Sequence, residues 1–307
     1  MGECCHGGVG SSGWVVFWSA MTALPAAVPV AAPDEVSTAL EVIATRPFVA
    51  LTGAGMSTDS GIPDYRGPNS PSRRPMTYSE FLSGPAAQQR YWARSHLGWS
   101  RMKRAVPNDG HRALARIEAV GRLRMLITQN VDGLHEAAGS EAVCALHGRI
   151  GDVVCLVCLA RTSRASLHDR MAALNPGWSD AHADVVVRPD GDVELSKTSG
   201  FRVPACESCG GVLKPDVVFF GENVPKPRVE RCYAAVDDLD PSSEALLVLG
   251  SSLTVMSGLR FVRHATKRGV PVVVVNRGST RGDDLATVKL EHGTSEFLTA
   301  LSTALSA

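Results

Sequence analysis

The sequence predicts an α/β protein built on a Rossmann-like, doubly wound parallel sheet, with a smaller inserted zinc-binding domain. Two observations predict the sheet. Short apolar runs are each followed by a polar or glycine-rich turn, and amphipathic helical patterns lie between these runs. A third observation predicts the insertion, because two C-x-x-C pairs lie in a segment that does not follow this alternation.

Several apolar runs have the length and composition of buried parallel strands. They are Phe48–Leu51, Leu123–Thr128, Ala245–Leu249 and Val270–Val275. Helical patterns occupy intervals between them, at Val36–Ala44, His111–Val120 and Leu259–Arg268. Ligands of doubly wound sheets bind beyond the carboxyl ends of the strands, so the polar turns after these runs are expected to face one crevice.

This alternation divides the chain into two domains. Residues 34–64, 111–147 and 215–307 form the Rossmann-like domain, and residues 65–110 and 148–214 form a smaller domain with a cofactor-covering segment and the zinc module. Residues 1–33 are expected to be a disordered or wrongly assigned N-terminal extension. A secretory signal needs a positively charged start, which residues 1–8 lack, and Met21 is an alternative start.

The composition excludes some partners. Lys and Arg together number 31, as do Asp and Glu, so a zero net charge argues against bulk binding to nucleic acid or to an anionic membrane. No stretch reaches transmembrane length without prolines. The C-x-x-C spacing favours metal over disulfides, so we expect a reducing, cytoplasmic location. The sequence predicts no oligomeric state.

The two C-x-x-C pairs are Cys155 with Cys158 and Cys206 with Cys209. Each spacing lets two sulfurs of one turn reach the same ion, and four thiolates satisfy a tetrahedral Zn²⁺. Gly210 and Gly211 permit the tight turn after the second pair. Since four cysteines leave no open coordination position, we expect a structural ion.

A glycine-rich turn follows the first predicted strand. Gly53 and Gly55 allow the chain to turn sharply and to bring backbone N–H groups against a phosphate, and a following helix would add its positive N-terminus. A plain strand-to-helix turn is the alternative, because G-x-G alone is weak. The continuation Asp64-Tyr65-Arg66 favours a ligand, since it places a carboxylate, an aromatic ring and a guanidinium together.

A second polar turn follows the second predicted strand. Gln129, Asn130 and Asp132 offer amide and carboxylate groups that can bind a carboxamide and ribose hydroxyls. His147, beside a glycine and before the first cysteine pair, is a candidate general base. The alternative for a single histidine is a satisfied or solvent-facing side chain.

Taken in order, these blocks resemble the sirtuin family, over roughly Val36–Leu301. The blocks are Gly53–Ser57, Gly61–Arg66, Thr128–Asp132, Leu146–Gly148, the cysteine pairs, Pro215–Glu222, Gly250–Leu253 and Val275-Asn276. Further stretches are similar to the class II sirtuins, the mitochondrial sirtuin 4-like subgroup and its bacterial relatives. These stretches are Gln89–Arg94, the wide cysteine gap, Leu174–Trp178 and Asp283–Leu285.

The resemblance implies an NAD-dependent protein-lysine deacylase with structural zinc that releases nicotinamide and O-acyl-ADP-ribose. His147 would be the base, with Asn130 and Asp132 also catalytic. The residues expected to bind NAD are Gly53, Ala54, Gly55, Ser57, Asp64, Tyr65, Arg66, Gln129, Asn130, Asp132, Gly250, Ser251, Ser252, Asn276, Arg277, Gly278 and Thr294. The residues expected to contact the acyl-lysine substrate are Tyr91, Arg94, Val218, Phe219, Phe220 and Gly221.

The extended run Val217–Gly221 is expected to pair with the substrate backbone as an added strand, a core strand being the alternative. Tyr91 and Arg94 have the spacing that sirtuins specific for acidic acyl groups use, which gives the hypothesis of a charged or bulky acyl group. Other functions stay open: a Rossmann oxidoreductase with structural zinc, a mono-ADP-ribosyltransferase on the same site, and a non-catalytic NAD- or zinc-binding module.

Overall fold

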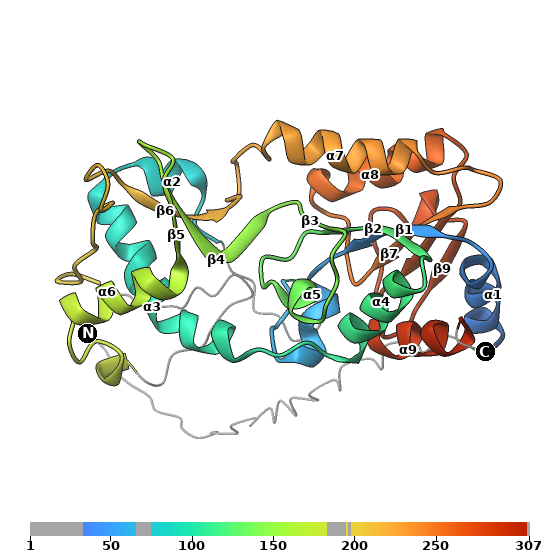
Figure 1. Cartoon of the computed structure of the whole chain (residues 1–307), viewed down its shortest axis with the longest axis horizontal. Coiled ribbons are helices and arrows are strands. Elements are labelled where there is room, and N and C mark those ends of the chain that lie inside the picture. The colour runs from blue at the N-terminus through green and yellow to red at the C-terminus, as the bar shows by residue number, and fades with distance from the viewer. Residues whose placement is uncertain (1–32, 66–74, 183–194, 196–197, 306–307) are drawn as a thin grey trace, which may run out of the picture.

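A six-stranded parallel sheet forms the larger part of the fold (Figure 1). The computed structural model describes residues 33–65, 75–182, 195 and 198–305, so the expected extension over residues 1–33 lies outside the described residues except for Pro33. The strand order is β3-β2-β1-β7-β8-β9, and all neighbours are parallel. The strands are β1 (Phe48–Thr52), β2 (Leu123–Thr128), β3 (Val143–Ala145), β7 (Ala245–Leu249), β8 (Val272–Val275) and β9 (Val288–Leu290).

Helices cover both faces of this sheet, which confirms the doubly wound α/β prediction. On one side lie α1 (Pro33–Ala44), α4 (Asp109–Ala119) and α9 (Thr294–Ala304), and on the other lie α7 (Lys226–Asp237) and α8 (Met256–Lys267). Side chains alternate between the two cores along each strand. In β1, Phe48 and Ala50 belong to the core with α1, α4 and α9, whereas Val49 and Leu51 belong to the core with α7 and α8.

The apolar runs predicted the central strands closely. Only Val270–Val275 is too long, because β8 begins at Val272. The edge strands β3 and β9 were not predicted, since three residues are too few to show a period.

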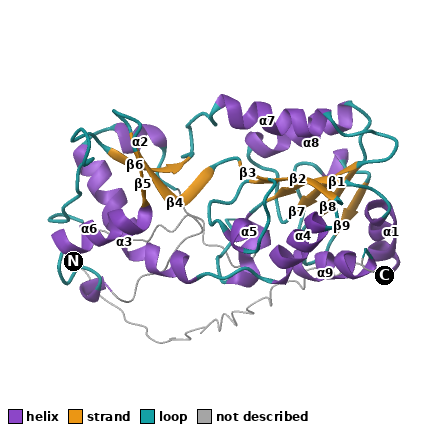
Figure 2. Ribbon diagram, in the orientation of Figure 1, coloured by secondary structure: helices purple, strands orange, loops and turns teal. Residues whose placement is uncertain are grey.

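A smaller lobe contains the antiparallel sheet β5-β4-β6 and three helices (Figure 2). Its elements are α2 (Tyr78–Leu82), α3 (Pro85–Arg104), β4 (Gly148–Cys155), β5 (Arg161–Ser163), α6 (Arg164–Leu174) and β6 (Leu213–Val217). The expected domain boundary at 214–215 falls inside β6. Trp92 is fully buried in this lobe, where its indole N–H donates to the Leu213 carbonyl at 3.0 Å. The remaining short elements are α5 (Leu134–Ala137) and the 3₁₀ turns η1 (Ala54–Ser60), η2 (Asp180–His182) and η3 (Asp283–Leu285).

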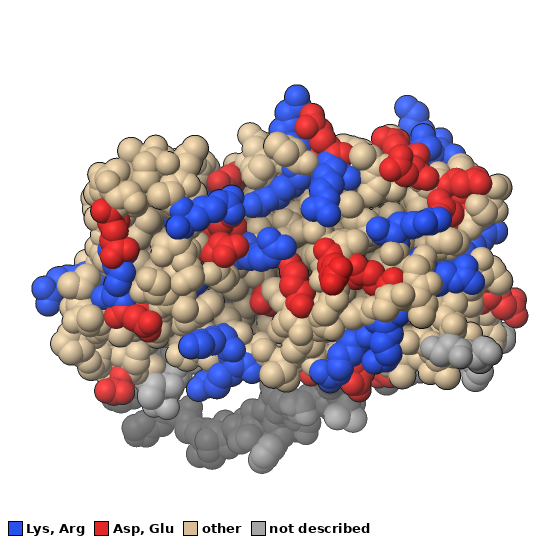
Figure 3. Space-filling view, viewed as in Figure 1, with Lys and Arg blue, Asp and Glu red and all other residues tan. Residues whose placement is uncertain are grey.

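The surface shows charges of both signs interspersed on the face seen in Figure 3, as the balanced composition implies. Among the described helices, none has both the length and the apolar character needed to cross a bilayer.

The carboxyl ends of β1 and β7 define the place where a ligand can bind. These strands are neighbours at the centre of the sheet, but the chain leaves β1 toward β2 and leaves β7 toward β8. Their following loops therefore diverge and open a crevice, as is general for doubly wound sheets.

Buried histidines predict acid-labile folding. Burial lowers the pKa of His96 and of His111 to about 4. In the unfolded chain a histidine takes up a proton near pH 6.5, whereas in the folded chain these two do so only near pH 4. The free energy of unfolding is therefore highest above pH 6.5 and falls as the pH drops toward 4, because the unfolded state binds more protons there. The slope should be about 1.4 kcal/mol per pH unit for each histidine. Chemical unfolding at several pH values between 7.5 and 4.5 measures it.

The variant His111→Gln measures the contribution of one histidine to this pH dependence. Its free energy of unfolding should fall less steeply between pH 6.5 and 4 than that of the parent, by about 1.4 kcal/mol per pH unit. Release of metal by acid acts on both proteins alike, so it cancels in the difference. Equal slopes would contradict the prediction.

Candidate active site

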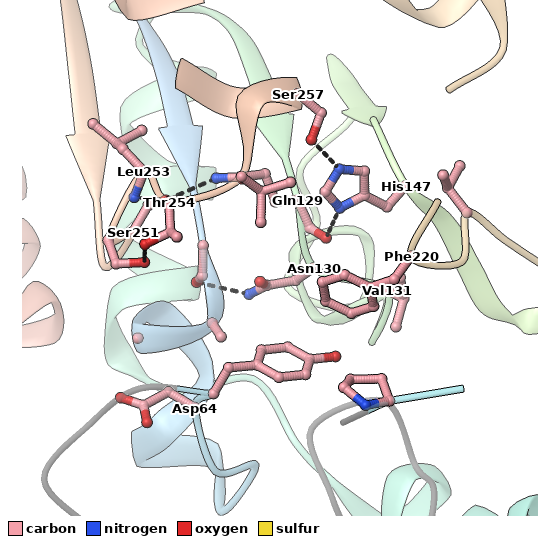
Figure 4. Close-up of a pocket in the computed structure, with 18 of the residues that line it drawn as sticks. Asp64, Gln129, Asn130, Val131, His147, Phe220, Ser251, Leu253, Thr254 and Ser257 are labelled. Atoms are coloured by element: carbon pink, nitrogen blue, oxygen red, sulfur yellow. Dashed lines mark hydrogen bonds between the residues drawn. The ribbon is translucent and has the colours of Figure 1, made fainter. Parts of the chain in front are cut away.

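A cavity of about 940 Å³ lies at the carboxyl ends of β1, β2, β7 and β8, between the large sheet and the smaller lobe. Figure 4 shows His147 at one side and Asp64 at the other. Residues from both lobes line it, and most of the residues predicted to bind NAD are among them. These are Gly53, Ala54, Gly55, Ser57, Asp64, Tyr65, Gln129, Asn130, Asp132, Gly250, Ser251, Ser252, Asn276, Arg277 and Gly278.

The glycines after β1 are required by a backbone contact with the turn after β7. A β-carbon at Gly53 would lie 2.7 Å from the β-carbon of Ser251, and one at Gly55 would lie 2.9 Å from the α-carbon of Gly250. The N–H groups of Gly53 and Gly55 donate to the carbonyls of Leu249 and Gly250 at 3.0 and 2.8 Å. These two amides therefore join the turns to one another.

The structure bears on two expectations for this loop. Backbone N–H groups of the loop were expected to face a phosphate, and those of Gly53 and Gly55 bond the turn after β7 instead. The predicted helix after the loop is the seven-residue 3₁₀ turn η1, ending at Gly61 in the left-handed region. Thr58 gives one reason for the difference, because its hydroxyl donates to the Gly55 carbonyl at 3.1 Å and so competes with helical hydrogen bonding.

A side chain of η1 meets side chains of the turn that follows β2. The Ser57 hydroxyl donates to the Asp132 carboxylate at 2.7 Å, and the Asn130 amide donates to the Gly53 carbonyl at 2.9 Å and to the Ser57 hydroxyl at 3.1 Å. Loss of solvation raises the pKa of Asp132. Hydrogen bonds from the Leu134 N–H and the Ser57 hydroxyl stabilise the ionised form and offset part of this rise. This network holds one carboxylate and one amide at fixed places in the cavity wall.

His147 has a defined tautomer. Its Nδ1 lies 2.9 Å from the Gln129 carbonyl oxygen, which can only accept, so neutral His147 carries its proton on Nδ1. Its Nε2 then presents a lone pair, and the Ser257 hydroxyl donates to it at 2.8 Å (Figure 4). Loss of solvation lowers the pKa of His147, so the imidazole stays neutral near pH 7. This arrangement suits a general base that acts through Nε2.

The four cysteines of the two C-x-x-C pairs converge in the smaller lobe. All four sulfurs lie within 4.8 Å of one another, with Cys155 3.5 Å from Cys209 and Cys158 3.8 Å from Cys206. A tetrahedron of sulfurs about 2.3 Å from a zinc ion has edges of about 3.8 Å. The quartet therefore fits a structural zinc ion, as the spacing predicted.

The two cysteine turns share one backbone geometry. The N–H groups of Leu159 and Gly210 donate to the carbonyls of Cys155 and Cys206 at 3.1 and 2.8 Å. Both residues have positive φ, 60° at Leu159 and 72° at Gly210. The second turn uses glycine for this conformation, and the first uses an exposed leucine.

Comparisons with known proteins agree with this geometry. The model of the Sir2 family matches residues 53–257. The chain belongs to the Sir2 family. It is 53% identical to the NAD-dependent protein deacetylase 1 of Mycobacterium avium (strain 104) over 86% of this chain and 94% of that protein. It is 54% identical to the protein of the same name from Streptomyces coelicolor, over 79% of this chain and 80% of that one.

Solved Sir2 structures share the fold. A Sir2 complex with a p53 peptide and NAD⁺ superposes with a TM-score of 0.66 at 29% identity, covering 89% of this chain and 98% of that one. A Sir2 protein bound to a propionylated peptide gives a TM-score of 0.67 at 29% identity, over 87% of this chain and 97% of that one.

The smaller lobe contributes an apolar wall to this Sir2 cavity. Its members come from separate elements but belong to one hydrophobic cluster. They are Ile62, Met76, Tyr91, Ile150, Val217 and Phe219. The Tyr91 ring packs against the Phe219 ring, with centroids 5.1 Å apart. This wall can receive an aliphatic group but offers it little charge.

The extended run predicted over Val217–Gly221 is not one continuous strand. β6 ends at Val217, the Val218 N–H donates to the His147 carbonyl at 2.8 Å, and the Phe220 carbonyl accepts from Tyr78 at 2.9 Å. The segment thus joins His147 to the smaller lobe, and it lines the cavity over its whole length.

Some predicted residues lie elsewhere. Thr294 is buried at the start of α9, and Arg94 is half-buried in α3, and neither is among the cavity-lining residues. Arg66 lies outside the described residues.

Other residues near the cavity were missed from the sequence. Ser257 and Arg260, in the first turns of α8, line it. The buried Lys214 pairs with Glu222 at 2.9 Å, and Glu222 accepts the Phe219 N–H at 2.8 Å, which fixes the loop Val218–Gly221. Local pattern gives no signal for these contacts, because their partners are distant in sequence or depend on the turn at Gly221.

The shared cysteine-turn geometry predicts different costs for two matched substitutions. Gly210→Leu should lower the free energy of unfolding by about 1 kcal/mol, because a side chain is strained in the left-handed region. Leu159→Gly relieves the same strain and should cost no stability. Thermal unfolding of zinc-saturated protein measures both. A neutral Gly210→Leu variant would show that the turns are not equivalent.

Proposed function

We propose that this chain is an NAD⁺-dependent protein-lysine deacylase that releases nicotinamide and transfers the acyl group to ADP-ribose. The observation that carries the proposal is the setting of His147. Its Nδ1 is fixed by a carbonyl, its Nε2 lone pair faces the cavity-lining Ser257, and its own carbonyl binds the substrate-side segment. The relatives named NAD-dependent deacetylases support the same activity.

The part of the cavity next to the large sheet fits a dinucleotide. The cavity is large enough for such a cofactor, and the polar groups on this side follow the ends of several strands. Arg260 and Arg277 line the cavity and could meet a diphosphate, and Arg277 would then exchange its ion pair with Glu296, 3.2 Å away, for a phosphate. Ser57, Asn130 and Asp132 offer partners to ribose hydroxyls. When bound, NAD⁺ supplies a nicotinamide glycosidic bond whose cleavage activates the ribose carbon toward the acyl oxygen.

The chain's own residues handle the proton. Neutral His147 accepts it at Nε2 from a hydroxyl of the bound substrate, at the place where the Ser257 hydroxyl now donates. The Gln129 carbonyl keeps the ring oriented and stabilises the imidazolium through Nδ1–H. Ser57 and Asn130 hold each other and Asp132 in place, so the polar groups need little reorganisation.

The peptide substrate is proposed to lie along Val218–Gly221. This segment follows β6 and lines the cavity beside Tyr91. An acyl-lysine side chain that enters between Phe219 and Tyr91 would meet the apolar wall. We therefore favour a short apolar acyl group such as acetyl or propionyl over the acidic group that the spacing of Tyr91 and Arg94 suggested, since Tyr91 lines the wall and Arg94 does not.

Three finer assignments belong to the same proposal. We assign the chain to the class II, sirtuin 4-like subgroup on its Gln89–Arg94 and Leu174–Trp178 stretches and its wide cysteine gap. We keep the division into a Rossmann-like and a smaller zinc-binding domain, with the boundary moved past β6. We keep the cytoplasm as the location, because four thiols must stay reduced to hold a metal.

Replacing the base tests the activity. His147→Ala should lower nicotinamide release with an acetyl-lysine peptide by roughly 10²- to 10⁴-fold. Because the pKa of His147 is lowered, its Nε2 stays unprotonated at neutral pH, and the parent's rate should decline only below about pH 6.5. His264→Ala is the matched control, since His264 pairs with Asp237 and is not a cavity-lining residue.

An active His147→Ala variant would contradict the assigned role. Nicotinamide release without loss of the acyl group from the peptide would instead indicate ADP-ribosyl transfer. No nicotinamide release at all, with NAD⁺ reduced by a substrate, would indicate an oxidoreductase.

The acyl preference is tested by comparing kcat/KM on acetyl-, propionyl- and succinyl-lysine peptides. The apolar wall predicts that the two uncharged groups exceed succinyl by about tenfold or more, because a carboxylate loses solvation there. Arg94→Met should leave this order unchanged. A succinyl preference that Arg94→Met abolishes would restore the acidic-acyl hypothesis.

A further inference from the structure

Two thiols outside the metal quartet lie together between β3 and α7, on the side of the large sheet covered by α7 and α8. Cys144 is in β3 and Cys232 is in α7, and their sulfurs are 3.4 Å apart. Both side chains are buried, with 4% and 0% of their surface exposed. At this distance the two sulfurs are in direct contact but are not joined by a disulfide, whose S–S bond is about 2.05 Å long.

A basic cavity opens beside Cys144. Its volume is about 250 Å³, and its walls come from β3, the start of β4 and the first half of α7. It is lined by Val143, Cys144, Ala145, Arg149, Pro227, Arg228 and Arg231. Three arginines therefore line the cavity that Cys144 faces, and two of them are also paired with carboxylates, Arg149 with Glu136 and Arg228 with Asp216. Neighbouring guanidinium groups favour the thiolate.

The hydrogen bond assigns different roles to the two thiols. Cys232 donates to Cys144, whose own thiol is placed to donate to the Arg228 carbonyl at 3.8 Å. The bond from Cys232, helped by Arg231, Arg228 and Arg149, lowers the pKa of Cys144 and outweighs the effect of burial. The same contact raises the pKa of Cys232. Cys144 lines the basic cavity and Cys232 does not, so Cys144 is the nucleophile of the pair and Cys232 is the second thiol.

We propose that Cys144 and Cys232 form an oxidisable pair that closes to a disulfide when hydrogen peroxide enters through the basic cavity. The Cys144 thiolate attacks one peroxide oxygen. The S–O bond forms, the O–O bond breaks, and hydroxide leaves and is protonated to water. The Cys232 sulfur then attacks Cys144, the S–S bond forms, and the sulfenic hydroxyl leaves with the Cys232 proton as water. Two thiols and one peroxide give one disulfide and two waters.

Closing this bond affects the active site through α7. The sulfurs must approach from 3.4 Å to about 2.05 Å, which draws α7 toward β3. One turn before Cys232, Arg228 lies 3.4 Å from the Asp216 carboxylate. Its guanidinium also lies 3.1 Å from the position that a β-carbon on Gly148 would occupy. Cys144 itself is three residues before His147. A shift of α7 therefore acts on the backbone that holds the base.

Peptide mapping tests the disulfide directly. The reduced, zinc-loaded full chain is treated with hydrogen peroxide, its free thiols are alkylated, and it is digested with trypsin. We expect residues 125–149 linked to residues 232–260, at a mass about 2 Da below the sum of the two free peptides, and separated by dithiothreitol. The metal quartet lies in other tryptic peptides, so its oxidation is scored separately. Recovery of both peptides as alkylated thiols, after peroxide has oxidised the quartet, would overturn the proposal.

An activity assay tests the coupling, and this arm alone depends on the proposed deacylase function. Peroxide should lower nicotinamide release on the order of tenfold, because small displacements of a catalytic group are costly, and dithiothreitol should restore it. Cys144→Ala and Cys232→Ala should start near the parent's activity and resist this loss. Equal, reversible loss in both variants would refute the coupling. A cross-link in a parent that has no deacylase activity would retain the thiol pair and refute the proposed function instead.

Discussion

The backbone contact between the turns after β1 and β7 organises the large-sheet side of this cavity. Gly53 and Gly55 lie against Gly250 and Ser251 so closely that no β-carbon fits between them. Two N–H groups join the turns, so their relative position is as well determined as the register of the strands beneath. The polar wall depends on this contact: Gln129 donates to Ser251 at 2.9 Å, and Asn130 donates to the Gly53 carbonyl.

His147 is held where the two lobes meet. His147 lies between β3 of the large sheet and β4 of the small one. Gly148, with φ of 80°, makes the turn, and a β-carbon there would lie 1.9 Å from the Asp216 carbonyl oxygen. The bond from the Val218 N–H to the His147 carbonyl then joins His147 to the segment Val218–Gly221. His147 thus lies at one of the places where the chain crosses between the lobes.

The chain uses its thiols in two distinct ways. In the quartet, tight turns direct backbone N–H groups at the sulfurs; the Cys158 and Val157 amides help to lower the pKa of Cys155 to about 6. Such turns hold anionic sulfur for a metal. In the Cys144–Cys232 pair no turn is present, and a buried strand and a helix bring the sulfurs together. Guanidinium groups take the place of the amides, which favours redox chemistry over metal binding.

The sequence by itself determined the doubly wound sheet, the metal quartet and most of the residues that line the cavity. These features are local: a buried strand is an apolar run, a cysteine turn is a fixed spacing, and polar turns after parallel strands must share one edge of the sheet. Only the tertiary structure decided why Gly53 and Gly55 are needed, that Ser257 meets His147, that Thr294 lies away from the cavity, and that Cys144 touches Cys232. Each of these depends on strand register and helix packing between segments far apart in the chain, and neither periodicity nor spacing encodes such contacts.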